Sequence, residues 1–267
     1  MTLADDPQLR AVFDGSTRWH RLRHEPVVGS TNDVALAELT DGAPPGLVVA
    51  ADRQRAGRGR RGRAWLDDVV GATGPVNLAV TATVATPNRP GLTPLVAGIA
   101  VAATADDLGV CTGLKWPNDV LVDGEKLAGI LVERHRTVGG DVVLIGCGVN
   151  VDWRGVRRDP AVGSWTSLAE LTGDDVPRAQ VLARLLHHLD AWLTVLTHEP
   201  AEVLTEYRRR SLTLGTVVRV ALPDDDVLQG EAVDIDTEGR LIVRRPDGGG
   251  TDDVVVAAGD VVHLRPA

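Results

Sequence analysis

The chain has 267 residues, enough for one large domain or for a medium domain followed by a small one. With 43% apolar and 24% charged residues it is typical of a soluble globular protein, and no apolar run is long enough to span a membrane. The net charge of −9 argues against a general nucleic-acid binder, because phosphates would repel the molecule. The N-terminus is acidic and broken by Pro7, which is not the pattern of a signal peptide. Cys111 and Cys147 lie in apolar stretches, which predicts reduced core thiols in a cytoplasmic protein.

The first part of the chain predicts alternating helices and strands. Roughly the first 15–20 residues predict irregular structure, because a proline and several acids interrupt the apolar pattern. Ser30, Thr31 or Asn32 caps the first predicted helix. Asp123-Gly124 is a strong turn signal between the strands of a hairpin. In chain order the predicted elements are a helix at 29–42, strands at 46–54 and 76–84, a helix at 93–109, a hairpin at 114–135, a strand at 141–152, and helices at 176–196 and 200–210.

The character of the sequence changes near its C-terminal end. From about Leu214 the chain consists of short strands separated by acidic or glycine-containing turns. That pattern predicts a small antiparallel barrel. We therefore expect an α+β protein with a mixed first domain at residues 1–211 and a small β-barrel domain at residues 212–267.

Residues 56–65, AGRGRRGRAW, contain glycines with the spacing of a dinucleotide-binding fingerprint. A Rossmann turn is excluded because glycines and a proline follow where a helix should begin, and no acid lies about 20 positions further on. A Walker loop is excluded because no Gly-Lys-Ser/Thr follows. What remains is a solvated basic loop or a mobile loop that becomes ordered on anions, and its position directly after a buried strand favours the latter. The cations of this stretch are Arg53, Arg55, Arg58, Arg60, Arg61 and Arg63.

Four motifs together resemble the biotin protein ligases. In chain order they are STN at 30–32, QRAGRGRRGRAW at 54–65, KWPNDVLVDGEKLAGILVE at 115–133 and GCGVNV at 146–151. The likeness extends over about residues 25–265. It implies a class II synthetase-like catalytic domain of the biotin/lipoate ligase type, built on a mixed sheet, followed by a small SH3-like barrel.

The resemblance implies a two-step reaction. Biotin and MgATP form biotinyl-5′-AMP and pyrophosphate, and the biotinyl group then passes to a lysine of a biotin carboxyl carrier domain of an acyl-CoA or pyruvate carboxylase. We expect ATP, Mg²⁺ and biotin to suffice, without a tightly bound prosthetic group, in a monomer or homodimer. The short stretch before the first motif cannot hold a helix-turn-helix domain, so we expect a ligase with neither DNA-binding control nor a membrane partner.

Formation of an acyl-adenylate brings a carboxylate to a phosphate, and these two anions repel each other. Cations placed beforehand lower this barrier, and the loss of one such group typically costs on the order of 100-fold in rate. By the family pattern, Arg58 and Arg60 hold the biotin carboxylate and the nascent phosphate, and Lys126 stabilises charge on the α-phosphate. Asp119 orients or deprotonates the incoming lysine amine, or assists metal binding. The expected catalytic residues are Arg60, Arg63, Lys126 and Asp119, and no metal ligand is assigned.

The resemblance also implies two sets of ligand contacts. The expected biotin-binding residues are Ser30, Thr31, Asn32, Gln54, Gly57, Arg58, Arg60, Lys126 and Gly129. The expected nucleotide-binding residues are Arg63, Trp65, Lys115, Trp116, Asn118 and Asn150. Structural interpretations stay open for Lys126 as an exposed hairpin lysine, Trp116 as a half-buried core residue, Asn118 and Asp119 as turn residues, and Asn150 as a satisfied amide.

The sequence departs from the family pattern after Trp65, where residues 66–78 are longer and more acidic than the usual turn. Three other functions stay open. A lipoate or octanoate ligase or transferase shares the scaffold, although its acyl chain needs a long apolar tunnel. A non-catalytic nucleic-acid module would use the arginines and the barrel, although the barrel is acidic and therefore has the wrong charge. A catalytically inactive biotin sensor is the third, although nothing in the sequence suggests it, since Arg60, Arg63 and Lys126 are all present.

Overall fold

The structure is a computed structural model, and it describes residues 3–65, 74–157, 164–222, 226–247, 250–257 and 259–263. A single turn of 3-10 helix, η1 (Leu3–Asp5), precedes helix α1 (Pro7–Gly15). Our expectation of an irregular N-terminus is therefore wrong. Asp6 caps α1 by accepting hydrogen bonds from the backbone N–H groups of Gln8 and Leu9, and Pro7 occupies the first turn. The Asp-Pro pair that we interpreted as an interruption is a helix start.

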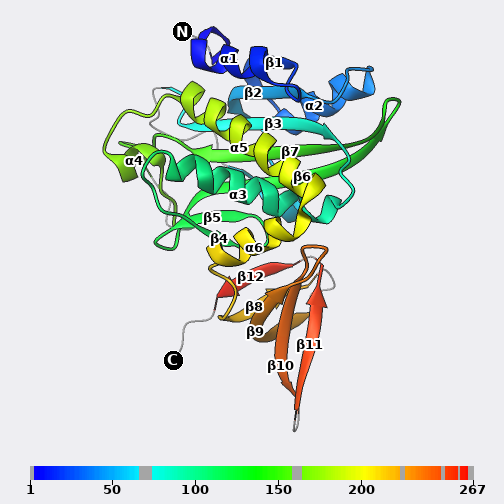
Figure 1. The fold of residues 1–267 in the computed structure, drawn as a ribbon. Coiled ribbons are helices and arrows are strands. Elements are labelled where there is room, and N and C mark those ends of the chain that lie inside the picture. The colour runs from blue at the N-terminus through cyan, green and yellow to red at the C-terminus, as the bar shows by residue number, and fades with distance from the viewer. Residues whose placement is uncertain are drawn as a thin grey trace.

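A seven-stranded mixed sheet forms the centre of the larger part of the chain (Figure 1). The outermost strand β1 runs parallel to β2, and every other neighbouring pair is antiparallel. Strand β1 was not predicted, because charged residues alternate with its apolar ones. The strand order is β1 (Arg21–Val28), β2 (Leu47–Gln54), β3 (Asn77–Ala85), β7 (Gly140–Asn150), β6 (Glu125–Thr137), β5 (Asp119–Val122) and β4 (Gly113–Lys115).

Helices cover both faces of this sheet. Figure 1 shows α3 (Thr93–Asp106) and α5 (Arg178–His198) across one face, where α3 packs between the sheet and its neighbouring helices. The other helices described are α2 (Thr31–Thr40), α4 (Leu168–Thr172) and α6 (Pro200–Arg210). Strand β2 alternates between the two layers, because Val48 and Ala50 join the main core while Leu47 and Val49 pack with α2. The face that α2 covers also carries the candidate site.

The C-terminal part is a separate antiparallel sheet. Its strand order is β11 (Gly250–Val256), β10 (Leu241–Asp247), β9 (Val227–Ile235), β8 (Val217–Ala221) and β12 (Asp260–His263). The predicted α+β class is confirmed. In the part of the chain that the structure describes, β11 and β12 are the two edges and do not pair, so closure into a barrel is not seen there. The domain boundary at 211/212 stays a prediction; α6 ends at Arg210 and β8 starts at Val217.

The turn between β9 and β10 joins the two sheets. Trp116 donates its indole N–H to the carbonyl of Gly239 at 3.0 Å, and Arg89 pairs with Glu238 at 3.3 Å. A Cβ at Gly91 would collide with the backbone of Glu238, so the backbones of these two segments are in direct contact there. The second sheet is thus attached beside the turn between β4 and β5 that carries Trp116. Figure 1 shows this sheet next to β4 and α6.

Two local predictions have opposite outcomes. Asp123 and Gly124 both have positive φ, at 50° and 83°, as the predicted two-residue hairpin turn requires. Cys147 is buried, and desolvation raises the pKa of its thiol to about 12, but Cys111 is exposed and our assignment of it to the core is wrong. It follows the end of α3 by five residues, where the chain has already left the core. None of the helices described is both long and apolar enough to cross a membrane.

Candidate active site

Most of the predicted biotin-binding residues meet in one cavity on the α2 side of the sheet. It encloses about 440 Å³ of space that opens to solvent. The start of α2, the end of β2, the arginine–glycine loop (residues 55–65), the turn before β5 and strands β3, β6 and β7 supply its walls. The predicted residues that line it are Ser30, Thr31, Asn32, Gln54, Arg58, Trp65, Asn118, Lys126 and Gly129. Four motifs that are far apart in sequence therefore contribute to a single cavity.

Glycines form the floor of the cavity. A Cβ at Gly148 of β7 would lie 2.5 Å from Cζ2 of Trp65, and one at Gly129 of β6 would lie 2.9 Å from its Cζ3. A Cβ at Gly146 would lie 2.6 Å from the side-chain oxygen of Asn32. Side chains essentially never approach this closely, so any side chain at these three positions would displace Trp65 or Asn32. The sequence pattern had marked only Gly129, although GCGVNV contains the other two.

At one end of the cavity the start of α2 is held by side chains of the sheet. Ser30 occupies the N-cap position, but its hydroxyl does not cap the helix, contrary to one of our predicted capping schemes. The side-chain amide oxygen of Gln54 instead accepts two hydrogen bonds from Thr31, one from the backbone N–H at 2.8 Å and one from the hydroxyl at 3.1 Å. Ser30 therefore lines the cavity with a side chain that does not cap the helix.

Asn32 is held at both ends of its amide. Its NH₂ group donates to Glu133 at 2.6 Å, and its oxygen accepts from the hydroxyl of Thr81 at 2.5 Å. The same Thr81 hydroxyl lies 2.8 Å from that of Thr31. Thr81 is fully buried in β3, where we had predicted nothing beyond an apolar alternation. Both polar groups of the Asn32 amide are therefore bonded to protein groups.

The arginine–glycine loop folds back on itself. Arg58 and Ala64 form an antiparallel bridge, the N–H of Gly59 donates to the carbonyl of Arg63 at 2.7 Å, and that of Trp65 donates to Gly57 at 2.8 Å. A 3-10 turn, η2 (Arg60–Gly62), forms its tip. The structure thus gives the loop a defined path, while the expectation that it becomes ordered only on anions stays a prediction.

At the other end of the cavity lies an ion pair. The amine of Lys126 is 2.6 Å from Asp119, on the neighbouring strand. It also lies 5.7 Å and 5.6 Å from the ring centroids of Trp65 and Trp165, within cation–π distance. Lys126 is only 24% exposed, which excludes the interpretation of a solvated hairpin lysine.

Trp165 was missed by the sequence analysis. Residues 164–167 run alongside Lys126, whose N–H donates to Ser164 at 3.0 Å and whose carbonyl accepts from Thr166 at 3.1 Å. Trp165 meets Trp65 edge to face, with centroids 5.5 Å apart, and stacks on Trp153 at 5.9 Å. A tryptophan in an otherwise polar segment of a chain with six tryptophans was the available signal.

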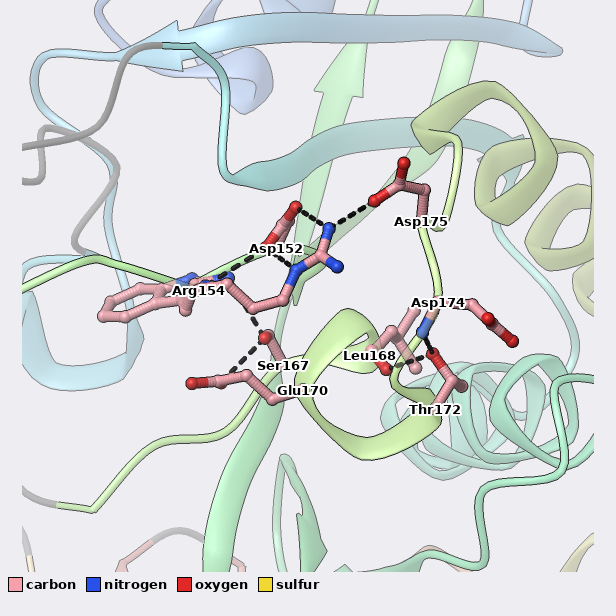
Figure 2. A network of polar contacts seen from close by, with 9 residues as sticks. Asp152, Arg154, Ser167, Leu168, Glu170, Thr172, Asp174 and Asp175 are labelled. Carbon is pink, nitrogen blue, oxygen red and sulfur yellow. Dashed lines mark hydrogen bonds and ion pairs between the residues drawn. The ribbon is translucent and has the colours of Figure 1, made fainter.

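A polar network braces this segment from behind (Figure 2). Ser167 accepts the N–H of Trp153 at 3.0 Å and donates to Glu170 at 2.8 Å. Arg154 pairs with Asp152 at 2.7 Å and with Asp175 at 2.6 Å. The hydrogen bonds that Arg154 donates hold the pKa of Asp152 below its ordinary value. Residues 152–154 are therefore joined to the chain on both sides of α4, through Ser167 before the helix and Asp175 after it.

Asn118 and Asn150, the two asparagines among the predicted nucleotide-binding residues, donate hydrogen bonds to backbone carbonyls. Asn118 donates to the carbonyl of Ile130 at 3.0 Å. Asn150 is fully buried, and its NH₂ group donates to the carbonyls of Lys126 at 3.0 Å and Thr166 at 2.9 Å. The side-chain oxygen of Asn150 has no hydrogen-bond partner in the described structure. Such an orphan acceptor is rare in a buried position.

The remaining predicted residues lie around the cavity. Gly57 adjoins it, since a Cβ there would lie 3.0 Å from the amide nitrogen of Gln54. Arg60 lines a neighbouring groove of about 930 Å³ with Trp116, Asn118 and residues of the β9–β10 turn. Trp116 is 2% exposed and packs in the core, so it is more buried than its structural interpretation as a half-buried residue, and its expected nucleotide contact stays a prediction. Arg63 is exposed, Lys115 is half-buried, and Asn150 lies behind Lys126. Residues 66–78, where the sequence departs from the family pattern, lie mostly outside the residues that the structure describes.

No metal ligands were assigned from the sequence. Among the residues that the structure describes, no group of three or more His, Cys, Asp or Glu side chains is placed to hold a metal ion.

Comparison with known proteins identifies the class that this fold and site define. A family model described as the biotin/lipoate A/B protein ligase family matches residues 25–150, and the biotin protein ligase C terminal domain matches residues 213–264. The biotin–[acetyl-CoA-carboxylase] ligase of Mycobacterium tuberculosis is 40% identical over 98% of this chain and 96% of its own length. The bifunctional ligase/repressor BirA of Escherichia coli is 31% identical over 82% of this chain and 68% of its own. The chain belongs to the biotin protein ligase family, as the motifs predicted.

Solved structures agree on the fold. The biotin protein ligase of Aquifex aeolicus in complex with biotin and ATP superimposes with a TM-score of 0.76 at 24% identity, covering 92% of this chain and 100% of that one. At this identity the likeness concerns the fold alone. It includes the arrangement of a mixed sheet followed by a small C-terminal sheet.

Proposed function

We propose that this chain activates biotin with MgATP and transfers it to a protein lysine. In the first step a biotin carboxylate oxygen attacks the α-phosphorus of ATP, which gives biotinyl-5′-AMP and releases pyrophosphate. In the second step a lysine amine attacks the acyl carbon, AMP leaves, and the amine loses a proton. The observation that carries this proposal is a cavity with neutral, hydrogen-bonded polar groups at one end and the Lys126–Asp119 pair at the other.

The α2 end suits the ureido ring of biotin. That ring is neutral and has both N–H donors and a carbonyl acceptor, so it needs polar partners without net charge. Ser30, Thr31 and Gln54 offer hydroxyl and amide groups and are each at most 8% exposed. The hydrogen bonds between Thr31 and Gln54 orient these two side chains before a ligand arrives, which reduces the ordering cost of binding.

The hairpin end suits the reacting groups. Lys126 places a positive charge in the cavity wall, where it attracts both the carboxylate and the α-phosphate. Arg60, at the loop tip in the adjoining groove, is the nearby cation that we assign to phosphate. Asp119 holds the amine of Lys126 in place and is the acceptor that we assign to the proton of the incoming lysine. Trp65 covers the glycine floor and shields the anhydride from water.

We assign Asn150 to holding the segment of Trp165 next to Lys126. Asn150 is fully buried, and its NH₂ group donates to the carbonyls of Lys126 and Thr166. Loss of these bonds would leave two buried carbonyls without a donor, at a cost of about 1–3 kcal/mol, so this residue supports the cavity wall from inside the fold.

The experiment that tests the function uses the full chain, biotin, MgATP and a purified biotin carboxyl carrier domain. Intact-mass spectrometry should find a single biotinyl addition on the carrier, dependent on both small molecules. The chain has two lysines, Lys115 and Lys126, so modification of the ligase itself is easily separated from that of the carrier. No addition to the carrier, together with no biotin-dependent exchange, would refute the proposal.

A lipoate or octanoate ligase is the second candidate, because the family model matching residues 25–150 includes both activities. The relatives named above are biotin ligases, and the polar groups at the α2 end of the cavity would be left without partners by an acyl chain that has no ureido ring. Exchange supported by lipoate and not by biotin would reverse this choice. We place the reaction in the cytoplasm with Mg²⁺ bound to ATP. The carrier's parent carboxylase and a monomeric or dimeric state belong to the same proposal.

A further inference from the structure

Arg58 lines the cavity, yet its guanidinium is already paired within the chain. Its two terminal nitrogens lie 2.6 Å and 2.7 Å from the two carboxylate oxygens of Asp33, a bidentate pair. Asp33 belongs to none of the motifs and follows Asn32 directly in the first turn of α2. We propose that Asp33 is a positioning residue that holds the arginine–glycine loop closed against α2 through Arg58.

A second carboxylate supports this arrangement. Glu133 of β6 lies 4.0 Å from the Arg58 guanidinium and accepts the amide of Asn32 at 2.6 Å. Arg58 therefore faces two anions that are fixed on different elements. The hydrogen bonds that it donates to Asp33 raise the pKa of Arg58 above its ordinary value, so the charge is strongly held. In this arrangement Arg58 anchors the loop, whereas the motif pattern had assigned it to the biotin carboxylate.

The place of Arg58 in the loop makes the anchor effective. Arg58 forms a β-bridge with Ala64 across the base of the loop. An interaction that fixes Arg58 therefore fixes both strands of the loop, while Arg60 at the tip lies outside the fixed part. Asp33 is also one residue from Asn32 and two from Thr31 of the cavity. The Asp33–Arg58 pair therefore links the helix end that faces one part of a ligand to the loop that covers the rest.

The pair is suited to opening and closing. The side chains of Arg58 and Asp33 are 40% and 52% exposed, and exposed ion pairs contribute little free energy. Loss of such a pair should shift the open-to-closed ratio of the loop by about fivefold, which corresponds to roughly 1 kcal/mol. An anchor of this strength biases the loop without locking it.

Trypsin provides a direct test, because the loop is rich in arginine. We expect Asp33→Asn to raise the initial rate of cleavage within residues 55–65 by about fivefold, with sites identified by mass spectrometry. Asp33→Glu, which keeps the carboxylate, should stay closer to wild type. The matched control is Glu38→Gln on the same helix, which breaks ion pairs with Arg21 and Arg23 and should leave loop cleavage unchanged. Unaltered loop cleavage in a folded Asp33→Asn protein would overturn the proposal.

A double-variant comparison tests whether Asp33 acts through Arg58. Arg58→Lys keeps a trypsin site and a positive charge but loses the planar fork that forms the bidentate pair. Adding Asp33→Asn to Arg58→Lys should then change loop cleavage much less than it does in the wild-type chain. A full fivefold increase in the Arg58→Lys background would instead show that Asp33 acts by another route and would refute the anchor.

The kinetic consequence rests on the proposed function. In biotin-dependent pyrophosphate exchange, Asp33→Asn should raise the KM for biotin about fivefold and change kcat less than about twofold, because the anchor stabilises the closed loop in the ground state and the transition state alike. A fall in kcat without a change in KM would contradict this role. Absence of exchange in the wild-type chain would overturn the proposed function, while the proteolysis result would still decide the anchor.

Discussion

The two ends of the cavity are built on different physical principles. At the α2 end, Thr31, Asn32, Gln54 and Thr81 are nearly fully buried, neutral, and hydrogen-bonded to one another or to Glu133. At the hairpin end, Lys126 and Asp119 are charged and remain 24% and 22% exposed. Neutral groups can be buried cheaply once they are hydrogen-bonded, whereas an ion pair that is fully buried incurs a large desolvation cost.

This difference explains how one cavity can serve both parts of a substrate such as biotin. The end that recognises a neutral ring can be preorganised by the protein alone, because its groups satisfy one another. The end that handles charge needs cations that can leave one partner for another, and Lys126 next to Asp119 meets that requirement. We therefore expect substitutions at the hairpin end to affect the rate of chemistry, and substitutions at the α2 end to affect binding.

The strongest separation of the two ends is expected from Lys126→Ala. It should lower biotin-dependent pyrophosphate exchange by about 100-fold, since a cation fixed near the developing charge is lost. Thermal unfolding and biotin binding should change far less. The matched control is Arg134→Ala on the same strand, whose partner Asp141 lies 2.7 Å away at the surface, and which should exchange normally. Near wild-type exchange in Lys126→Ala would show that the charge at this end is not catalytic.

The opposite signature is expected from Thr81→Val at the α2 end. The change keeps the shape of the side chain but removes the hydroxyl that holds Asn32 and Thr31. Leaving these buried groups unsatisfied costs about 1–3 kcal/mol, so the Kd for biotin should rise by roughly tenfold while kcat is retained. Calorimetric titration with biotin measures this.

Thr83→Val is the control for Thr81→Val, two residues along the same strand. Thr83 is equally buried, but its hydroxyl donates to the carbonyl of Leu47 at 2.9 Å, away from the cavity. Thr83→Val should lower the stability of the fold without weakening the binding of biotin. If both valine variants lose biotin affinity to the same extent, the loss reflects general destabilisation and the α2 end is not specifically organised.

The contrast also explains what could be predicted from the sequence. The motif residues were found because each motif is local, and because strand ends and turns bring them to one side of the sheet. Gln54 ends β2, Lys126 is the second residue of β6 after the predicted turn, and Asn150 ends β7. The strands at β2, β3 and β7 and the hairpin at Asp123-Gly124 followed from apolar alternation and turn chemistry, whereas the order of the strands in the sheet was not predicted.

The residues that were missed act at long range. Glu133 meets Asn32 across 101 positions, and Asp33 meets Arg58 across 25, and neither contact has a local pattern. Thr81 looked like one more β-branched strand residue, although its hydroxyl organises the α2 end. Helix α1 was missed because its capping signal also interrupts an apolar pattern. Such contacts become visible only when the packing of the sheet is known.

A smaller effect is expected behind the α2 end, at Asp52. It lies on β2 two residues before Gln54, with Arg178 at 2.5 Å and His24 at 2.9 Å. Burial alone would raise the pKa of Asp52, but the hydrogen bonds from Arg178 and His24 hold it below its ordinary value. A carboxyl whose pKa is lowered in the folded state stabilises the fold above its unfolded pKa of about 3.9 and loses that contribution as pH falls through the folded pKa.

Asp52→Asn should therefore cost about 1–2 kcal/mol of unfolding free energy at pH 7, and should reduce the acid-dependent loss of stability below about pH 5. Urea unfolding at several pH values measures both quantities. An Asp253→Asn variant, whose exposed partner Arg244 lies 2.8 Å away in the other sheet, serves as the comparison and should cost much less. Equal costs would show that the pair behind β2 is no stronger than a surface pair.

The smallest expected effect lies beyond the charged end, where the two sheets join. His263 of β12 lies 3.1 Å from the hydroxyl of Thr213, which in turn accepts the backbone N–H of Trp116 at 3.0 Å. Burial, and then the positive charge of Lys115, lower the pKa of His263. The fold therefore favours the neutral ring of His263. The stabilising contribution of this neutral ring is present above the ordinary histidine pKa of about 6.5 and is lost as pH falls through the lowered pKa.

In the wild-type chain we expect protonation of His263 to lower Tm by less than about 2 °C between pH 7 and pH 5. His263→Gln should abolish this decrease, whereas His198→Gln at the surface of α5 should preserve it. The same decrease in both variants would mean that protonation elsewhere sets the acid sensitivity, and that the junction between the sheets is not electrostatically coupled to Lys115.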